Sequence, residues 1–529
     1  MSQAITIYQV FTRLFRNDNP TNRQFGTIEQ NGCSKFSHFT PEVLQALTEF
    51  GITHIWFTGV IRHASCTSYE THGLPANNPL IVKGVAGSPY AITDYYDVDP
   101  DLADAPQNRM EEFKQLIDRC HNYKLKVIID FVPNHVARQY ESKNLPSGRT
   151  NLGANDNTNL SFSPLNNFYY LPGQDFQAPE GINFPFTLGH GIYKEFPAKA
   201  TGNDAFTSHP GINDWYETIK LNYGVNYQNN RESSFNPVPD TWFKMLDIMN
   251  FWAQKGIDAL RCDMAEMVPV EFWSWAIPKV KEHNKEINFI AEVYNPMEYS
   301  NFLTAGFDYL YDKVGLYDIL RDLTEGGGST KNITYLWQRY EGYSHRMLRF
   351  LENHDEQRIA SSQFAGDPWK AIPAMILAAT LNTGPLMIYF GQEIGEKAQD
   401  TEGYSGYDGR TTIFDYWCVK EYQKWVNKGR VGTNLLNEDQ KNLRNSYSKL
   451  NQLRLTSKAI HSGGFYDLMW VNNHLPDINK IYAYLRYSEN DILLIVLNFD
   501  LHRSFDIRLK IPADAIKIFG LSESHEMTA

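Results

Sequence analysis

The sequence predicts an α/β protein built on a (β/α)8 TIM barrel, with an inserted domain after strand 3 and a C-terminal antiparallel β domain. Eight short apolar runs alternate with helical patterns, and two regions break this alternation. Near-continuous apolar runs are typical of strands that a parallel sheet buries on both faces. Eight strand–helix units with this spacing favour a closed barrel. The runs are 5–11, 52–60, 127–132, 257–262, 289–293, 307–311, 348–351 and 385–390.

Helical patterns occupy the segments between these runs. Their apolar residues recur at the spacing that places them on one face of a helix. The clearest four segments are 41–50, 109–123, 240–255 and 371–381.

The first break in the alternation is the segment 136–235, which is irregular and rich in Asn, Gly, Pro and aromatic residues. A loop of this length is rarely structureless inside a compact domain. We therefore expect an inserted domain at 136–235, which divides the barrel into residues 1–135 and 236–434.

The second break begins near residue 435. The segments 481–486, 492–498 and 505–509 alternate apolar and polar residues, as half-buried strands do. The sequence therefore predicts a C-terminal β-sandwich domain over residues 435–529.

Composition limits the classes of partner. The chain has 529 residues, of which 42% are hydrophobic, and its net charge is −12. No apolar stretch approaches the roughly 18 residues that a membrane span needs. The negative charge argues against nucleic acid as a partner. The sequence leaves the oligomeric state open.

The cysteines and the N-terminus bear on location. The five cysteines are widely spaced and form no Cys-x-x-Cys pattern, which argues against a disulfide framework. Residues 1–6 lack the basic and apolar segments of a secretion signal. We expect a cytoplasmic protein, with an exported form whose signal was removed as the open alternative.

Acidic side chains gather where four of the apolar runs end. Asp130, Asp263, Glu292 and Asp355 lie in or directly after the third, fourth, fifth and seventh runs. The active site of such a barrel lies at the carboxyl ends of its strands. Arg261 precedes Asp263 by two residues, so both side chains lie on one face of a strand. We expect this arginine to keep the pKa of Asp263 low.

Paired carboxylates at one barrel mouth indicate glycoside hydrolysis. One carboxylate attacks the anomeric carbon, while a second, protonated carboxyl group releases the leaving oxygen. The second group must spend part of the cycle protonated, which demands a raised pKa. A metal-dependent barrel hydrolase is disfavoured, because the chain has no clustered His-x-His or His-Glu-x-x-His motif.

At these residues the sequence resembles the α-amylase family of retaining glycosidases, closest to its maltodextrin-active and neopullulanase-like enzymes. The resemblance covers nearly the whole chain. It implies that Asp263 is the nucleophile, that Glu292 is the general acid/base and that Asp355 stabilises the transition state. The matching segments are Asp130–His135 (DFVPNH), Gly256–Asp263 (GIDALRCD), Ile290–Tyr294 (IAEVY) and Phe350–Asp355 (FLENHD).

The resemblance also implies substrate-binding residues. Tyr90, in the segment SPYAITDYY, lies where the family places a tyrosine that stacks on the sugar at the cleavage point. His135 and His354 are expected to donate hydrogen bonds to sugar hydroxyls. Asp130 and Arg261 complete the substrate-binding set.

Two departures from the family pattern affect substrate and metal. After the nucleophile, many α-amylases carry a Lys-His pair that contacts glucose beyond the cleavage point, where this chain has Glu266 and Met267. Lys220 stands where a calcium-binding amylase has aspartate, and an ammonium group cannot ligate Ca²⁺. We therefore expect no metal ligands and no cofactor, although calcium is the family's usual ion.

The resulting function is hydrolysis of α-1,4-glucosidic bonds in maltodextrins or starch-like glucans through a covalent glycosyl-enzyme intermediate. A glucanotransferase of the same family is the first alternative, because the same residues serve both reactions. A non-catalytic carbohydrate-binding relative is the second. The preferred chain length, endo or exo action and tolerance of α-1,6 bonds are left open by the sequence.

Overall fold

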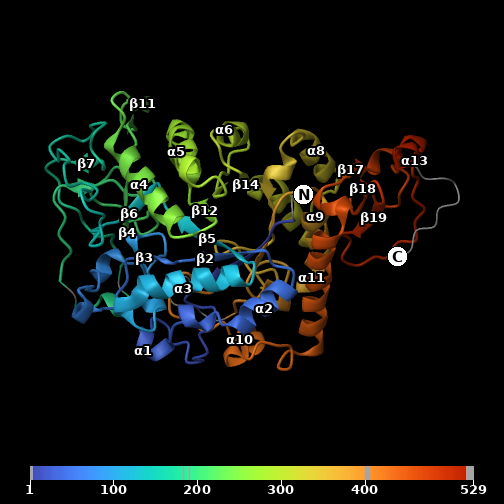
Figure 1. The fold of residues 1–529 in the computed structure, drawn as a ribbon, viewed down its shortest axis with the longest axis horizontal. Helices are drawn as coiled ribbons and strands as arrows, with labels where there is room; N and C mark the ends of the chain where they lie inside the picture. The colour runs from blue at the N-terminus through green and yellow to red at the C-terminus, as the bar shows by residue number, and fades with distance from the viewer. Residues whose placement is uncertain (1–3, 183, 190, 400–405, 520–529) are drawn as a thin grey trace.

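The computed structural model of the protein describes residues 4–182, 184–189, 191–399 and 406–519. Its centre is a barrel of eight parallel strands (Figure 1). A parallel bridge between Arg349 and Leu386 joins the two end strands and closes the barrel. The strands, in spatial order, are β15 (Met347–Leu348), β14 (Tyr309–Tyr311), β13 (Asn288–Ala291), β12 (Ala259–Cys262), β5 (Lys126–Phe131), β2 (His54–Thr58), β1 (Thr6–Phe11) and β16 (Leu386–Tyr389).

All eight apolar runs of the sequence contain or overlap one of these strands, so the predicted barrel is confirmed. The strands are almost wholly buried because their two faces pack in different cores. One core lies inside the barrel and receives one side chain from every strand. These side chains are Ile7, Trp56, Ile128, Ala259, Ile290, Tyr311, Leu348 and Met387.

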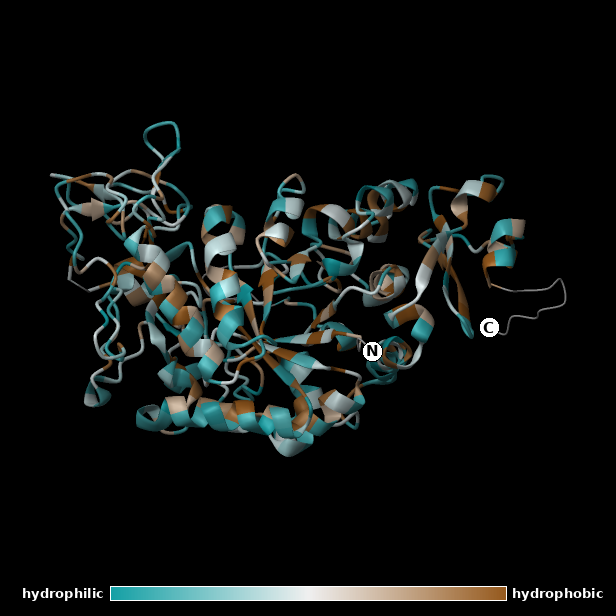
Figure 2. Cartoon of the chain, turned by 45° about the horizontal axis from the view of Figure 1, so that its top comes forward, coloured by the Kyte–Doolittle hydropathy of each residue, from teal (hydrophilic) through white to brown (hydrophobic). Residues whose placement is uncertain are grey.

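Helices cover the outside of the barrel, and the four helices expected from the sequence are present. In α3 (Arg109–Asn122) the buried residues Phe113, Leu116, Ile117 and Cys120 form one face against the strands. Figure 2 shows hydrophilic residues on the outer helices and hydrophobic residues on the central strands. The others are α1 (Ile28–Asn31), α2 (Pro41–Glu49), α4 (Asp240–Gln254), α5 (Val270–His283), α6 (Tyr299–Thr304), α7 (Asp318–Thr324), α8 (Lys331–Arg339), α9 (Ile372–Thr380) and α10 (Lys420–Val426).

Among the described residues, we find no helix with the length and apolar character that crossing a membrane requires.

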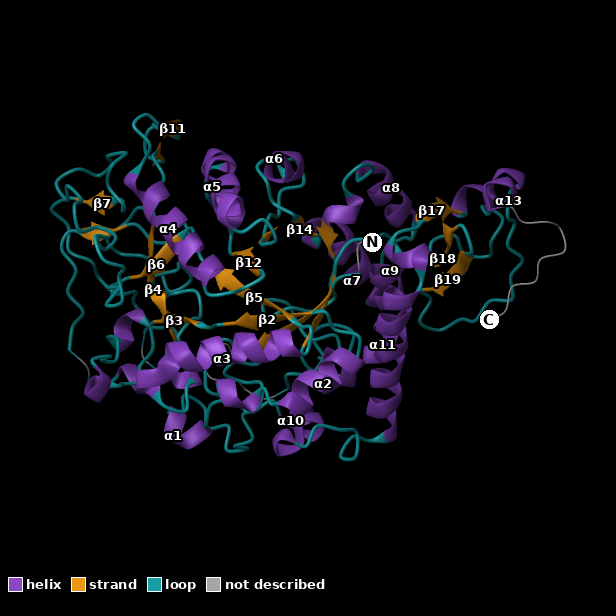
Figure 3. Ribbon diagram, viewed as in Figure 1, coloured by secondary structure: helices purple, strands orange, loops and turns teal. Residues whose placement is uncertain are grey.

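Between β5 and α4 the chain leaves the barrel in a loop-rich excursion, at the left of Figure 3. Short antiparallel pairs hold this excursion together, and the first pair joins its start to its end. The pairs are β6 (His135–Ala137) with β9 (Thr218–Lys220), β7 (Tyr170–Leu171) with β8 (Ala198–Lys199), and β10 (Val225–Asn226) with β11 (Glu232–Ser233). Beside it, β3 (Ile61–His63) pairs with β4 (Ile92–Val98). The domain boundaries at 135/136 and 235/236 stay a prediction.

The C-terminal region contains the expected antiparallel sheet, but its extent differs from the expectation. The described residues form one three-stranded sheet of β17 (Gly464–Asp467), β18 (Ile481–Ser488) and β19 (Asp491–Asn498). The expected strand at 505–509 is absent from this described segment. Nearby backbone groups bond to side chains instead: Asn472 binds both the N–H and the C=O of Lys510.

The start of the expected sandwich is helical. Residues Glu438–Thr456 form α11, whose N-cap Asn437 and third residue Gln440 exchange hydrogen bonds in a capping box. Two short helices, α12 (Lys458–His461) and α13 (Ala513–Phe519), flank the sheet. Residues 520–529 of the predicted sandwich lie outside the described residues. The boundary at 434/435 stays a prediction.

Candidate active site

A polar layer lies directly above the apolar interior of the barrel. Side chains alternate along a strand, so a residue two positions after an interior residue also points inward. Because the strands are parallel, these second residues gather toward the carboxyl-end mouth. They include Gln9, Thr58, Asp130, Arg261 and Glu292, which follow Ile7, Trp56, Ile128, Ala259 and Ile290.

Arg261 is the centre of this layer and is fully buried. Its Nη1 lies 2.6 Å from Asp263 Oδ1 and 3.3 Å from Asp130 Oδ1. Its Nη2 lies 2.8 Å from Glu292 Oε2, and its Nε donates to the Tyr311 hydroxyl at 3.2 Å. Three carboxyl groups therefore share one guanidinium.

This charge imbalance favours protonated carboxyl groups. Burial raises the pKa of Asp263 well above its ordinary value, and Glu292 raises it further, although Arg261 lowers it. Burial likewise raises the pKa of Asp130. The expectation that Arg261 keeps the pKa of Asp263 low is wrong, because one cation does not offset burial together with neighbouring acids.

Glu292 is held at both of its oxygens. Oε2 accepts a hydrogen bond from the Met264 backbone N–H at 2.7 Å, and Oε1 accepts one from the Tyr294 hydroxyl at 2.5 Å. Met264 has a φ of 44°, in the left-handed region, directly after Asp263. This turn directs the Met264 N–H toward Glu292.

The opposite side of the site is built on His354. Its Nε2 lies 3.0 Å from Asp355 Oδ2 and 2.5 Å from the Tyr90 hydroxyl, and its Nδ1 lies 2.8 Å from Gln9 Nε2. The rings of Tyr90 and His354 stack with centroids 5.3 Å apart. The Asp355 side chain stays 42% exposed, so it faces solvent beside Asp263 and Glu292.

A pocket of about 240 Å³ opens over these groups. Five of the eight candidate residues line it: Tyr90, His135, Asp263, Glu292 and Asp355. The other three candidate residues do not line the pocket but contact residues that do. Arg261 contacts Asp263 and Glu292. Tyr90 is contacted by Asp130 and His354. The structure thus brings all eight residues together.

The pocket also has lining residues that the sequence did not single out. Lys83 and Glu217 form an ion pair of 3.1 Å at its wall. Tyr294 had a signal, because it lies two residues after Glu292 and so shares its face if the strand direction continues. The remainder come from loops and, for Thr218, from the start of β9, where no periodic pattern marks them. They are Ser88, Trp215, Thr218, Met264, Ile413 and Phe414.

Lys220 lies beside the pocket, in the position where the family resemblance implies a calcium ligand. Its Nζ donates to Asn134 Oδ1 at 2.8 Å and lies 2.6 Å from Asp204 Oδ1. Burial, with Lys220 and Lys83, lowers the pKa of His135 to about 3, so this pocket residue is neutral at pH 7. An ammonium group has no lone pair for a metal. These residues do not fit a calcium ion.

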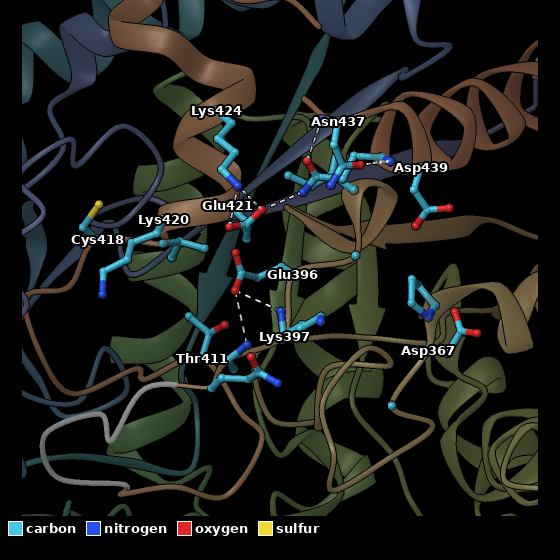
Figure 4. Close-up of a pocket in the computed structure, with 18 of the residues that line it drawn as sticks. Asp367, Glu396, Lys397, Thr411, Cys418, Lys420, Glu421, Lys424, Asn437 and Asp439 are labelled. Atoms are coloured by element: carbon cyan, nitrogen blue, oxygen red, sulfur yellow. Dashed lines mark hydrogen bonds and ion pairs between the residues drawn. The ribbon is translucent and has the colours of Figure 1, made fainter. Parts of the chain in front are cut away.

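A larger pocket of about 540 Å³ lies among the loop after β16, α10 and the start of α11 (Figure 4). None of the eight candidate residues lines it. Its acids have local partners: Glu421 lies 2.6 Å from Lys424, and Glu396 accepts two backbone N–H groups from Lys397 and Ala398. The smaller pocket is therefore the candidate active site.

A family model decides the assignment of the chain. Residues 9–463 match the model described as "Alpha amylase, catalytic domain". This match covers the barrel, the excursion after β5 and α11.

The chain belongs to the alpha-amylase family.

Other members of the alpha-amylase family resemble the chain over most of its length. A cyclomaltodextrin glucanotransferase from Bacillus sp. (strain 38-2) is 23% identical over 524 residues, which is 93% of this chain and 59% of that enzyme. Neopullulanase 2 from Thermoactinomyces vulgaris is 22% identical over 74% of this chain and 57% of its own length. The chain thus spans less than two thirds of both enzymes.

Among solved structures, a maltogenic alpha-amylase AmyB from Thermotoga neapolitana matches with a TM-score of 0.56 and 20% identity. The match covers 94% of this chain and 86% of that one. It shows that the alpha-amylase fold extends over nearly the whole described chain.

Proposed function

We propose that this chain is a retaining glycoside hydrolase that cleaves α-1,4-glucosidic bonds of maltodextrins or starch-like glucans. One observation carries the proposal: Asp263 and Glu292 contact the same guanidinium, while Asp355 faces the same pocket. The shared contact keeps the two carboxyl groups close. Retaining enzymes need such closeness, with a separation of about 5–5.5 Å, because the nucleophile attacks directly.

The mechanism follows from the positions of these groups. Asp263, ionised, attacks the anomeric carbon and forms a covalent β-glycosyl intermediate, while Glu292 gives its proton to the departing sugar oxygen. Glu292 then takes a proton from water, which displaces Asp263 and restores the α configuration. Asp355 supports the positive charge of the oxocarbenium-like transition state, and Tyr90 stacks on the sugar.

The raised pKa of Asp263 adds a condition to this mechanism. The nucleophile must lose its proton before it attacks, so the pH-rate profile is expected to fall on the acid side at a higher pH than an ordinary aspartate would give.

We propose that the enzyme uses no calcium at the family's shared position. The contacts of Lys220 with Asn134 and Asp204 support this proposal, because the ammonium group supplies a positive charge there without a metal.

A glucanotransferase is the second candidate, and the similarity to cyclomaltodextrin glucanotransferases favours it. The two activities differ only in whether water or another sugar accepts the glycosyl group. Chain lengthening at high maltoheptaose concentration would identify the transferase.

Product analysis tests the main proposal. We expect maltoheptaose to yield shorter maltodextrins whose new reducing ends are first released in the α configuration, as polarimetry or NMR detects. First release in the β configuration would overturn the retaining mechanism. The absence of cleavage, with binding intact, would indicate the non-catalytic carbohydrate-binding relative.

We also propose a cytoplasmic location, supported by the odd number and wide spacing of the five cysteines. Cell fractionation tests it, and recovery of the protein only outside the cytoplasm would overturn it.

A further inference from the structure

We propose that the Tyr294 hydroxyl determines which oxygen of Glu292 carries the transferred proton, and that Glu266 is the residue that positions Tyr294. This inference rests on the proposed function, because it assigns roles to residues around its acid/base.

The two oxygens of Glu292 have different surroundings. Oε2 faces the Met264 N–H at 2.7 Å and Arg261 Nη2 at 2.8 Å. Both are donors that cannot accept a proton. Oε1 contacts the Tyr294 hydroxyl at 2.5 Å, and a hydroxyl can donate or accept.

This asymmetry places the acidic proton on Oε1. A proton on Oε2 would meet the Met264 N–H and the positive charge of Arg261, whereas a proton on Oε1 meets a hydroxyl that can rotate. When Oε1 gives its proton to the departing sugar oxygen, Tyr294 donates to the new anion. When water later returns a proton to Oε1, the hydroxyl turns away or accepts. Burial, together with Glu292, raises the pKa of Tyr294, so the phenol keeps its own proton throughout.

Glu266 fixes the backbone that carries Tyr294. Its Oε2 accepts the backbone N–H groups of Tyr294 at 2.9 Å and of Asn295 at 3.0 Å. Glu266 lies three residues after Asp263, so it links the segment after the nucleophile to the segment after the acid/base. The side chain at this position, where many family members have lysine, therefore holds the site together.

Other ionisable groups also face Glu292 or Tyr294. On β12, β5 and β14, three groups influence the carboxyl groups: Arg261, Asp130 and Tyr311. Asp263 acts from the residue directly after β12, and Asp355 acts on Tyr294 from the loop that follows β15. A Tyr294→Phe substitution leaves all of them in place. A comparison with the unmodified enzyme therefore isolates the hydroxyl.

The experiment measures kcat/KM for maltoheptaose against pH. In Tyr294→Phe, we expect the alkaline limb to move up by about one pH unit, because the ionised carboxylate loses a donor. The acid limb, which reports Asp263, stays in place. The role of Tyr294 would be overturned if the pH profiles of the two proteins had the same acid and alkaline limbs and differed only in a lower maximum kcat/KM. An unmodified enzyme that leaves maltoheptaose intact would overturn the proposed function and this inference together.

Glu266 is tested with a matched pair of variants. Glu266→Ala removes the acceptor, and we expect part of the same alkaline shift; Glu266→Gln keeps an acceptor and is expected to restore the original limb. In the Tyr294→Phe background, Glu266→Ala should move the limb no further. An equal shift in that background would show that Glu266 acts without Tyr294. If Tyr294→Phe fails to fold, the two Glu266 variants provide the test. The proposal is overturned if Glu266→Ala and Glu266→Gln have the same alkaline limb in their pH profiles.

Discussion

The candidate catalytic pocket and the larger pocket of Figure 4 are both rich in acids, but their charges are arranged in different ways. In the catalytic pocket, Asp130, Asp263 and Glu292 surround the single buried guanidinium of Arg261. In the larger pocket of Figure 4, each acid contacts its own donor, as Glu421 contacts Lys424. The acids of the larger pocket have separate donors, whereas three carboxyl groups share one cation at the smaller pocket.

This difference teaches that the number of acids does not identify a catalytic site. A carboxyl group beside its own lysine at a partly exposed surface stays ionised and gains little. Burial raises the pKa of Asp130 and of Asp263 around the one cation, and proton exchange by groups with a perturbed pKa is what acid/base catalysis uses. The smaller pocket therefore carries the chemistry.

The largest expected effect is loss of activity in Asp263→Asn. An amide cannot attack the anomeric carbon, so kcat should fall at least about 10⁴-fold. Glu421→Gln, in the larger pocket, is the control and should keep its activity. Rates of maltoheptaose cleavage check both variants. An active Asp263→Asn protein would place the nucleophile elsewhere and end the distinction between the pockets.

Arg261→Met tests the shared cation. Removing one partner of a buried ion pair destabilises a protein by about 3–5 kcal/mol, and three acids lose their partner here. Lys424→Met removes a cation from the larger pocket, where both partners are partly exposed, and should cost about 1 kcal/mol or less. Urea unfolding at pH 7 measures both. Equal losses would show that the two pockets do not differ in charge balance.

The acid limb of the pH profile sharpens the comparison. Burial is the largest influence that raises the pKa of Asp263, and Glu292→Gln leaves this burial in place. The mechanism requires a protonated, neutral Glu292 when Asp263 ionises, so this substitution should leave the acid limb at its raised pH. A substrate with an activated leaving group, such as α-maltosyl fluoride, makes the general acid unnecessary for the first step. The rate of fluoride release from this substrate, measured against pH, gives the acid limb of the variant. An acid limb that moved to lower pH would show that Glu292 is ionised where Asp263 titrates, and would contradict its role as the general acid.

The raised pKa also affects stability. The folded state binds a proton at Asp263 more tightly than the unfolded chain does, so this group favours folding below its unfolded pKa. The contribution is lost as the pH rises through the raised folded pKa. Asp263→Asn should therefore be more stable than the unmodified protein at neutral pH, and this advantage should shrink on acidification. Thermal unfolding between pH 4 and 8 measures the trend.

The barrel could be predicted from the sequence because each strand is buried on both faces and reads as an apolar run. The carboxyl ends of the predicted strands then located the acidic residues of the site. The C-terminal region was harder, because 505–509 has the alternation of a strand while nearby backbone groups bond to Asn472. The helix α11 had a local signal in the sequence, because Asn437 and Gln440 have the spacing of a capping box.

The site was predictable where strands end and unpredictable where loops approach. Asp263 and Glu292 directly follow β12 and β13, and Asp355 lies in the segment that leaves β15, so their meeting follows from the barrel. Lys83 and Glu217 meet only because two loops come together over the mouth. The raised pKa of Asp263 also depends on how charges are arranged in space. The sequence shows Arg261 two residues before Asp263, but it does not show how many carboxyl groups contact that guanidinium.

The smallest expected effect concerns the position of Lys220, where we propose that a side chain rather than a metal supplies the positive charge. Chelation with EDTA should leave the unfolding midpoint within about 1 °C and the activity unchanged, because Lys220 already contacts Asn134 and Asp204. Lys220→Met is the matched control and should destabilise the protein by about 1–3 kcal/mol, since a charged hydrogen bond is lost. A marked fall in the midpoint after chelation would show that a bound cation is needed, and that local side-chain charge balance does not hold at this position.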